Sequence, residues 1–152
     1  MRVVNALLVK DEKVLLLYKE TRQKWFLPGG KSEFGESVIQ TGCREFLEET
    51  GLDLQDAVLG AVTTIVLPER QEEWMLYTLK ATKALGDWIA ENREGILRWH
   101  SVAAVKTLPM FEGDRFIVDK LLDEKQQLPI VSAQLYTVSY ELNKIMEGRF
   151  GG

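Results

Sequence analysis

The segment from Ser37 to Gly51 constrains the fold more than any other, because it carries signals for both ends of one helix. Ser37 and Gln40 form the Ser-x-x-Gln pattern of a capping box, which predicts where the helix begins. Gly51 predicts its end, since glycine adopts the left-handed conformation without a Cβ penalty. At about 100° per residue the helix is amphipathic. Its expected apolar face consists of Ile39, Cys43, Phe46, Leu47 and Thr50.

Three glutamates, Glu45, Glu48 and Glu49, crowd the last turns of this helix on the side opposite the expected apolar face. The like charges of Glu45 and Glu49, four residues apart, destabilise a helix by about 0.3 kcal/mol. The helix dipole disfavours acids near the C-terminus by a similar amount, and Arg44 is the one obvious local counter-charge. A solvated acidic face leaves these penalties in place. A divalent cation that prefers oxygen ligands, Mg²⁺ or Mn²⁺, would remove them, and spacing alone leaves both interpretations open.

The other apolar runs predict an α/β (α+β) architecture in which a mixed sheet is flanked by helices, because strands and helices do not alternate regularly. Residues 25–37 contain Pro and Gly and are expected to form a loop. The expected strands are 3–9 and 13–20, paired as a hairpin, then 57–68, 74–84, 95–102 and 132–142, the last packing Leu135 and Val138. A short helix is expected over 102–108 and a longer one over 114–125.

Length and charge limit the class of protein. With 152 residues, 45% of them apolar, the chain can build one core. We expect a single domain over residues 1–146 and a flexible end over 147–152. A net charge of −4 without a Lys/Arg block gives no attraction for a nucleic acid polymer or a membrane surface, and no apolar run predicts a membrane span or signal peptide. One cysteine, Cys43, excludes an internal disulfide and suits a cytoplasmic protein.

From Gly30 to Leu52 the chain reads Gly, five residues, Glu36, seven residues, then REFLEETGL. This resembles the Nudix box, G-x5-E-x7-R-E-U-x-E-E-x-G-U with U aliphatic or aromatic, and every specified position matches. The resemblance implies the Nudix fold, a mixed β-sheet sandwiched between α-helices. It also implies hydrolysis of a nucleoside diphosphate linked to another group X, with Mg²⁺ or Mn²⁺ as cofactor.

The same resemblance implies roles for the residues of the box. Glu45, Glu48 and Glu49 would bind the metal, Arg44 would hold them in position, and Glu36 would support the site or join the metal shell. The carbonyl of Gly29 or Gly30 would complete the coordination. Bound cations would neutralise charge on the phosphoryl oxygens and lower the pKa of a water nucleophile.

The sequence GGKS at 29–32 ends like a phosphate-binding P-loop. That motif requires glycine five positions before the Gly-Lys pair, and position 25 is Trp, so the P-loop interpretation fails. Lys31 is either a contact to a substrate phosphate or an exposed lysine.

Residues 94–122 are similar to the MutT-like, 8-oxo-dGTP diphosphatase branch of the family. In that branch an aromatic residue and an aspartate near this point contact the nucleobase, and the matching residues are Phe111 and Asp114. Gly113 replaces the first acid of the branch's acidic pair. The alternative is structural: Phe111 in the core and Asp114 as the N-cap of the helix at 114–125.

A general base outside the box is expected at Glu94, with Glu91 as the neighbour to control for. The single histidine, His100, is expected to be structural or merely exposed. Cys43 is expected to be a small core residue and not a nucleophile.

The leading hypothesis is a nucleotide-binding enzyme, monomeric or homodimeric, that converts a nucleoside triphosphate to the monophosphate and pyrophosphate. An ADP-ribose or ADP-sugar pyrophosphatase is the alternative, since that branch often has proline where Pro68 stands, 16 residues past the box. A non-catalytic nucleotide sensor is a third hypothesis, which the intact box disfavours.

Overall fold

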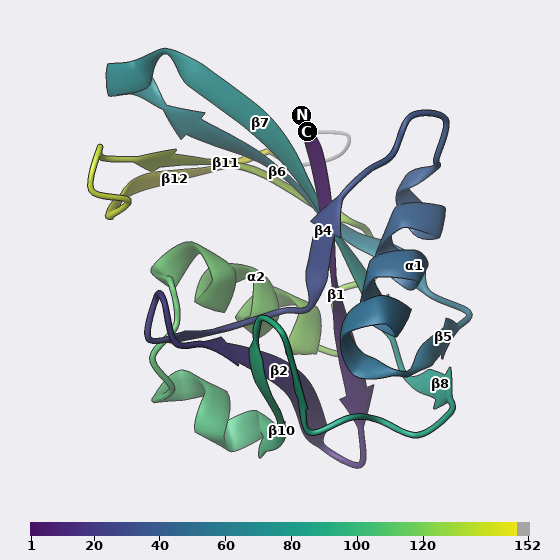
Figure 1. Cartoon of the computed structure of the whole chain (residues 1–152). Coiled ribbons are helices and arrows are strands. Elements are labelled where there is room, and N and C mark those ends of the chain that lie inside the picture. The colour runs from purple at the N-terminus through teal and green to yellow at the C-terminus, as the bar shows by residue number, and fades with distance from the viewer. Residues whose placement is uncertain (149–152) are drawn as a thin grey trace.

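Strand β1 (Arg2–Lys10) lies at the centre of the molecule (Figure 1). It pairs in parallel with β7 (Glu72–Ala81) and antiparallel with β2 (Lys13–Lys19) and β4 (Gly29–Lys31). The computed structural model describes residues 1–148. Within them the main sheet runs in the order β12-β11-β6-β7-β1-β2-β10-β9, with β3 on β2 and β4 on β1. It therefore mixes parallel and antiparallel neighbours, as expected.

The remaining elements complete the sheet and cover it. The α-helices are α1 (Val38–Thr50) and α2 (Glu112–Leu122), and the 3-10 helices are η1 (Pro68–Arg70) and η2 (Val102–Lys106). The remaining strands are β3 (Lys24–Phe26), β5 (Asp53–Gln55), β6 (Val58–Leu67), β8 (Lys83–Leu85), β9 (Glu91–Asn92), β10 (Gly95–Ser101), β11 (Ile130–Tyr136) and β12 (Leu142–Gly148). No helix of residues 1–148 is long and apolar enough to cross a membrane.

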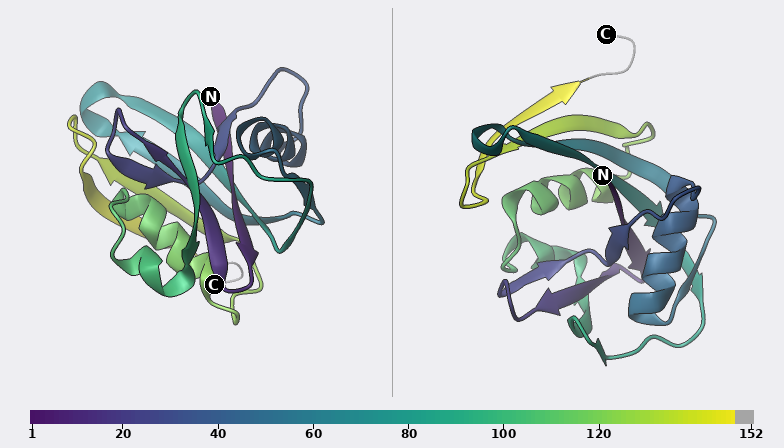
Figure 2. Two further views of the ribbon diagram at one scale, coloured as in Figure 1. Left: turned by 60° about the horizontal axis from the view of Figure 1, so that its bottom comes forward. Right: turned by 45° about the horizontal axis from the view of Figure 1, so that its top comes forward.

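The core occupies both faces of the sheet, because successive side chains of β1 point in opposite directions. Ala6 and Leu8 belong to the cluster that contains Phe46 of α1, whereas Leu7 belongs to the cluster that contains Ile117 of α2. The two helices accordingly lie on opposite sides of β1 (Figure 2). This arrangement confirms the expected sheet between α-helices.

Both predicted ends of α1 are confirmed. Ser37 Oγ accepts a hydrogen bond from the Gln40 amide at 3.1 Å, and Gln40 Oε1 accepts one from the Ser37 amide at 2.8 Å. Gly51 follows the helix in the left-handed conformation, with φ 81°. A Cβ at this position would also come 2.6 Å from the carbonyl oxygen of Asp87, so only glycine fits there.

The predicted apolar face of α1 is partly wrong. Ile39 and Leu47 are exposed, while Glu49, assigned to the acidic face, is only 8% exposed. The helix is rotated because Gly42 lets it approach the sheet: a Cβ there would lie 2.3 Å from a methyl carbon of Leu79. Close packing at Gly42 turns Glu49 inward and Leu47 toward solvent.

Two other predictions need correction, and a third is not tested. The expected loop at 25–37 includes part of β3 and all of β4, because their backbones pair with β2 and β1. The expected strand at 132–142 is two strands, β11 and β12, joined by a turn that leaves Val138 exposed. The flexible end expected over 147–152 stays a prediction: Glu147 and Gly148 are the last residues of β12, and residues 149–152 lie outside the described residues.

Candidate active site

Arg44 is the hub of the acidic cluster on α1. Its Nε and Nη2 donate to the two carboxylate oxygens of Glu36 at 2.7 and 2.9 Å, and Nη1 donates to Glu45 at 3.0 Å and to Glu48 at 3.4 Å. The Arg44 hydrogen bonds lower the pKa of Glu36 to about 2, and the Glu36 hydrogen bond raises the pKa of Arg44 further. With both oxygens of Glu36 occupied, this pair is a support that orients Glu45 and Glu48.

Glu49 lies on the inner side of α1, where its Oε2 accepts a hydrogen bond from the Gly29 amide at 2.8 Å. Burial raises the pKa of Glu49 well above its usual range, and the neighbouring Glu94 carboxyl raises it further. The structure thus brings Glu94 from the β9–β10 turn to the helix that carries the box. Two adjacent carboxylates in a partly buried place are an arrangement that a cation stabilises.

Two residues that the sequence did not single out hold Glu94 in this position. Asn92 Nδ2 donates to the carbonyl of Glu49 at 2.8 Å, and Asn92 Oδ1 accepts the Glu94 amide at 2.7 Å. The ammonium of Lys19 lies 4.0 Å from Glu94 and 4.8 Å from the ring centre of Phe26. No sequence spacing marks these contacts, because they join β2, β9 and α1 only in the folded chain.

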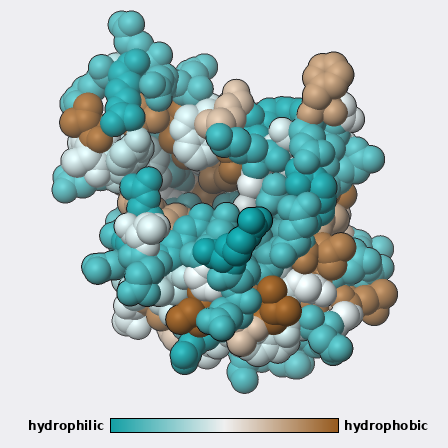
Figure 3. Space-filling model, in the orientation of Figure 1, coloured by the Kyte–Doolittle hydropathy of each residue, from teal (hydrophilic) through white to brown (hydrophobic). Residues whose placement is uncertain are grey.

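A pocket of about 440 Å³ opens beside the acidic cluster. It lies below the lobe formed by the ends of β6, β7, β11 and β12, where the surface is hollowed (Figure 3). Gly29 and Lys19 line this pocket and also contact Glu49 and Glu94, so the pocket and the cluster are adjoining parts of one site. The other lining residues are Val3, Asn5, Thr21, Arg22, Phe26, Leu27, Ile65, Leu67, Trp74, Leu76, Phe111, Asp114, Tyr136 and Tyr140.

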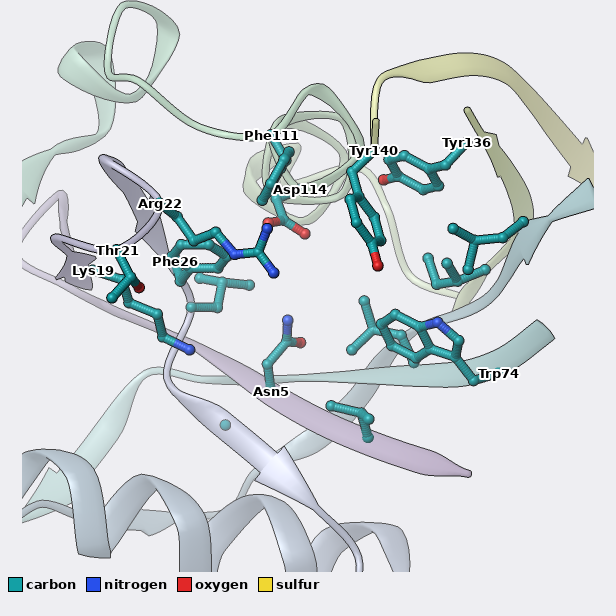
Figure 4. Close-up of a pocket in the computed structure, with 16 residues that line it drawn as sticks. Asn5, Lys19, Thr21, Arg22, Phe26, Trp74, Phe111, Asp114, Tyr136 and Tyr140 are labelled. Carbon is teal, nitrogen blue, oxygen red and sulfur yellow. The ribbon is translucent and has the colours of Figure 1, made fainter. Parts of the chain in front are cut away.

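Phe111 and Asp114 both line the pocket (Figure 4). Phe111, and not Asp114, is the N-cap of α2, so the expected capping role of Asp114 is wrong. The Phe111 ring packs edge-on to Phe26 with centroids 5.7 Å apart. Burial raises the pKa of Asp114 to about 6, while the charge of Lys19 opposes this shift.

Asn5 is a further polar residue of the pocket that the sequence did not single out. Its Oδ1 is buried without a hydrogen-bond partner within the described residues, and the residue lies opposite Gly29 in the β1–β4 ladder. Its position as the one polar residue within the apolar run VVNALLV was the available signal. An unpaired buried acceptor beside a pocket is suited to receive a hydrogen bond from a ligand.

Comparison with known proteins identifies the family. A model described as the NUDIX domain matches residues 1–121. The chain belongs to the Nudix family. It is 40% identical over 144 residues to an uncharacterized Nudix hydrolase, YvcI, of Bacillus subtilis, covering 93% of this chain and 90% of that one. A crystal structure described as a mutator MutT protein from Bacillus halodurans superposes with a TM-score of 0.90, at 36% identity and 96% coverage of both chains.

A second Bacillus subtilis protein, named a putative 8-oxo-dGTP diphosphatase, is 31% identical over 103 residues. That match covers 67% of this chain and 64% of the relative. Family membership makes the protein a hydrolase, since its matched relatives are Nudix hydrolases. Nudix hydrolases act on small nucleotide substrates and use divalent metal ions.

The side chains of the Nudix box fit such an ion chemically, although they are not gathered around one point. Within residues 1–148 no three His, Cys, Asp or Glu side chains converge in a metal-binding arrangement. The donor set is nevertheless all oxygen, which suits Mg²⁺ and Mn²⁺. Gly30 leaves the necessary room, because a Cβ there would lie 2.4 Å from the carboxyl carbon of Glu45.

Three residues discussed from the sequence, Lys31, His100 and Cys43, do not line the pocket. Lys31 is exposed on β4, and its carbonyl accepts a hydrogen bond from Arg44 at 3.2 Å. His100 packs edge-on against Trp25 with centroids 4.3 Å apart. Cys43 is half-buried against the core, and burial raises the pKa of its thiol. These surroundings agree with structural roles for His100 and Cys43.

Proposed function

We propose that this Nudix hydrolase is a Mg²⁺-dependent pyrophosphohydrolase that converts a purine nucleoside triphosphate, including an oxidised one of the 8-oxo-dGTP type, to the monophosphate and pyrophosphate. One observation carries the proposal: the pocket that can hold a nucleoside shares Gly29 and Lys19 with the acidic cluster. A nucleoside seated in the pocket would therefore have its phosphates directed toward Glu49 and Glu94.

At the base end, aromatic and polar groups together suit a purine. Phe111 offers a ring for stacking, and the Asp114 carboxyl and Asn5 amide offer hydrogen-bonding groups to a base edge. With a pKa of about 6, Asp114 can present either a donor or an acceptor near neutral pH. Its partner in the branch's acidic pair is replaced by Gly113, so Asp114 would read the base together with Asn5.

At the phosphate end, Glu45, Glu48 and Glu49, with the Gly29 carbonyl, would hold Mg²⁺ or Mn²⁺, and Arg44 would orient the first two. The bound ion supplies charge neutralisation and a water of lowered pKa. Lys19 would contact a phosphate, because its ammonium lies between Glu94 and the pocket. Glu94, in contact with Glu49, would accept a proton from the attacking water.

Relatives support the choice of substrate, since one is named a putative 8-oxo-dGTP diphosphatase. The ADP-sugar alternative has less support. Pro68 occupies the first position of η1 and does not line the pocket, so it serves the backbone. The intact Nudix box supports an enzyme over a non-catalytic sensor.

The test is a panel of nucleotides with Mg²⁺, followed by identification of the products. We expect a purine triphosphate, or its 8-oxo form, to give the highest kcat/KM and to release pyrophosphate. Release of AMP and a sugar phosphate from ADP-ribose as the preferred reaction would contradict the proposal. In the same panel, Asp114→Ala should reduce the preference for purine over pyrimidine about 10-fold or more, the equivalent of one lost base contact.

A further inference from the structure

We propose that Tyr140, in the β11–β12 turn, is a substrate-binding residue that forms the outer wall of the nucleotide pocket, and that Arg70 is the residue that positions it. The inference rests on the proposed function, because it assumes that a nucleotide occupies this pocket. It concerns a part of the chain that the family model does not include, since that model ends at residue 121 and the hairpin spans 130–148.

The hairpin contributes directly to the site. Tyr136 and Tyr140 both line the pocket, although neither lies near the Nudix box in the sequence. Tyr136 is fixed from behind, because its hydroxyl donates to Gln134 Oε1 at 2.6 Å and Gln134 donates to the Gly113 carbonyl at 3.0 Å. The hairpin is therefore anchored to the first turn of α2, which also carries Asp114.

The turn presents Tyr140 in a defined conformation. Thr137 organises the turn: its carbonyl accepts the Tyr140 amide at 2.9 Å, and its Oγ1 lies 3.0 Å from Ser139 Oγ and accepts the Glu141 amide at 3.1 Å. Tyr140 itself has φ 62°, a left-handed conformation that is uncommon for an aromatic residue. Such a conformation persists only where surrounding contacts hold it.

Arg70 provides one of those contacts from η1. Its Nη1 donates to the Tyr140 hydroxyl at 3.0 Å, and its guanidinium lies 5.3 Å from the centre of the Tyr140 ring. Within residues 1–148 Arg70 makes no ion pair with a carboxylate. Tyr140 is thus the side chain that Arg70 contacts through its guanidinium.

Arg22 reaches Tyr140 from the opposite side of the pocket mouth. It belongs to the β2–β3 turn, and its guanidinium lies 5.5 Å from the Tyr140 ring centre. In Figure 4 the Arg22 guanidinium extends toward the Tyr140 ring from the other side of the pocket, and the Tyr140 ring points into the pocket that Phe111 and Asp114 also line. Three turns that are distant in the sequence, those carrying Arg22, Arg70 and Tyr140, therefore meet at this ring.

The chemistry of this wall indicates what it recognises. An aromatic ring opposite Phe111 suits a flat, polarisable group, and nucleobases stack on aromatic side chains. Within residues 1–148, the hydrogen bond and the cation contacts of the Tyr140 ring come from Arg70 and Arg22, not from the acidic side chains of α1. Its loss should therefore weaken nucleotide binding and leave the hydrolytic step unchanged.

The experiment compares kcat and KM of five variants with wild type, using the nucleotide that wild type hydrolyses best. We expect Tyr140→Ala to raise KM about 10-fold, as for one lost stacking contact, with kcat within about threefold of wild type. Tyr140→Phe, which keeps the ring, should raise KM only about threefold. Arg70→Ala should raise KM less than Tyr140→Ala, and the double variant no more than Tyr140→Ala alone. Val138→Ala, exposed in the same turn, is the control and should match wild type.

A KM for Tyr140→Ala within twofold of wild type would overturn the proposal, as would fully additive effects of Arg70→Ala and Tyr140→Ala. Circular dichroism melts show whether Tyr140→Ala is folded. If it is not, the KM values of Tyr140→Phe and Arg70→Ala decide, and values within twofold of wild type for both would overturn the proposal. The proposed function fails separately, if wild type prefers a substrate that is not a nucleoside triphosphate. The same KM comparison then applies to that substrate, and calorimetric Kd values for ATP replace KM if nothing is hydrolysed.

Discussion

The carboxylate of Glu49 accepts a hydrogen bond from the backbone amide of Gly29 at 2.8 Å. This bond joins the C-terminal half of α1 to β4, the strand that borders both the acidic cluster and the pocket. It explains why an acid is buried at the end of a helix, where the dipole disfavours it. Under the proposed function, this connection would fix the distance from the metal-binding carboxylates to the nucleoside.

Glu49→Gln should reduce kcat at least about 100-fold and leave the fold intact. Residues that merely support metal ligands already contribute about 10- to 100-fold, so loss of a proposed ligand should exceed that range. Gln Oε1 can still accept the Gly29 amide, and the buried charge is removed. Turnover with Mg²⁺ and a thermal melt provide the measurement, with the exposed Glu124→Gln as control. Wild-type turnover in Glu49→Gln would refute the assignment.

Glu94→Gln should lower kcat about 100-fold with little change in KM, because general base catalysis typically contributes at least that factor. Glu91→Gln, at an exposed position of β9 three residues before Glu94, is the matched control. A kcat for Glu94→Gln within about threefold of wild type would assign the base elsewhere.

Glu36 should stabilise the fold only while it is ionised. Its pKa is about 2 in the folded protein and 4.5 as an ordinary glutamate, so its stabilising effect is fully present above pH 4.5 and is lost as the pH falls toward 2. Glu36→Gln should therefore be less stable than wild type at pH 7, and the difference should shrink at pH 3.5. Urea unfolding at both pH values measures it. Glu33→Gln, 3.8 Å from Arg44 but exposed, should show a smaller difference.

Asp114 should have the opposite pH dependence. Its pKa rises from 3.8 to about 6 on folding, so the folded state holds the proton longer and wild-type stability falls as the pH rises from about 4 to above 6. Asp114→Asn removes this loss and should gain up to about 3 kcal/mol over wild type at pH 8, with little gain at pH 4. Urea unfolding at the two pH values tests the sign. Equal gains at both would show that Asp114 titrates normally.

Local signals in the sequence predicted the local structure of the site correctly. The capping box at Ser37 and the left-handed Gly51 define the ends of α1 because both act within one turn of the chain. The hairpin of β1 and β2 was also predicted correctly, since its strands are adjacent in sequence. The box itself identified the acidic cluster, and family membership now agrees with it.

Long-range packing was not predictable in the same way. The helical wheel placed Leu47 inside and Glu49 outside, because it contains no information about Gly42 and Leu79, which set the rotation of α1. Lys19, Asn92 and Tyr140 reach the site from segments that no motif connects. Their roles follow from contacts made across the folded chain.

The most direct test of the central claim is a Mn²⁺ titration followed by electron paramagnetic resonance, with nucleotide present. Mn²⁺ is used because it prefers the same oxygen ligands as Mg²⁺. We predict that wild type removes free Mn²⁺ from solution in a saturable manner and that a variant with both Glu48→Gln and Glu49→Gln does not. Equal Mn²⁺ binding by the two proteins, or none by wild type, would contradict a cation site at the end of α1.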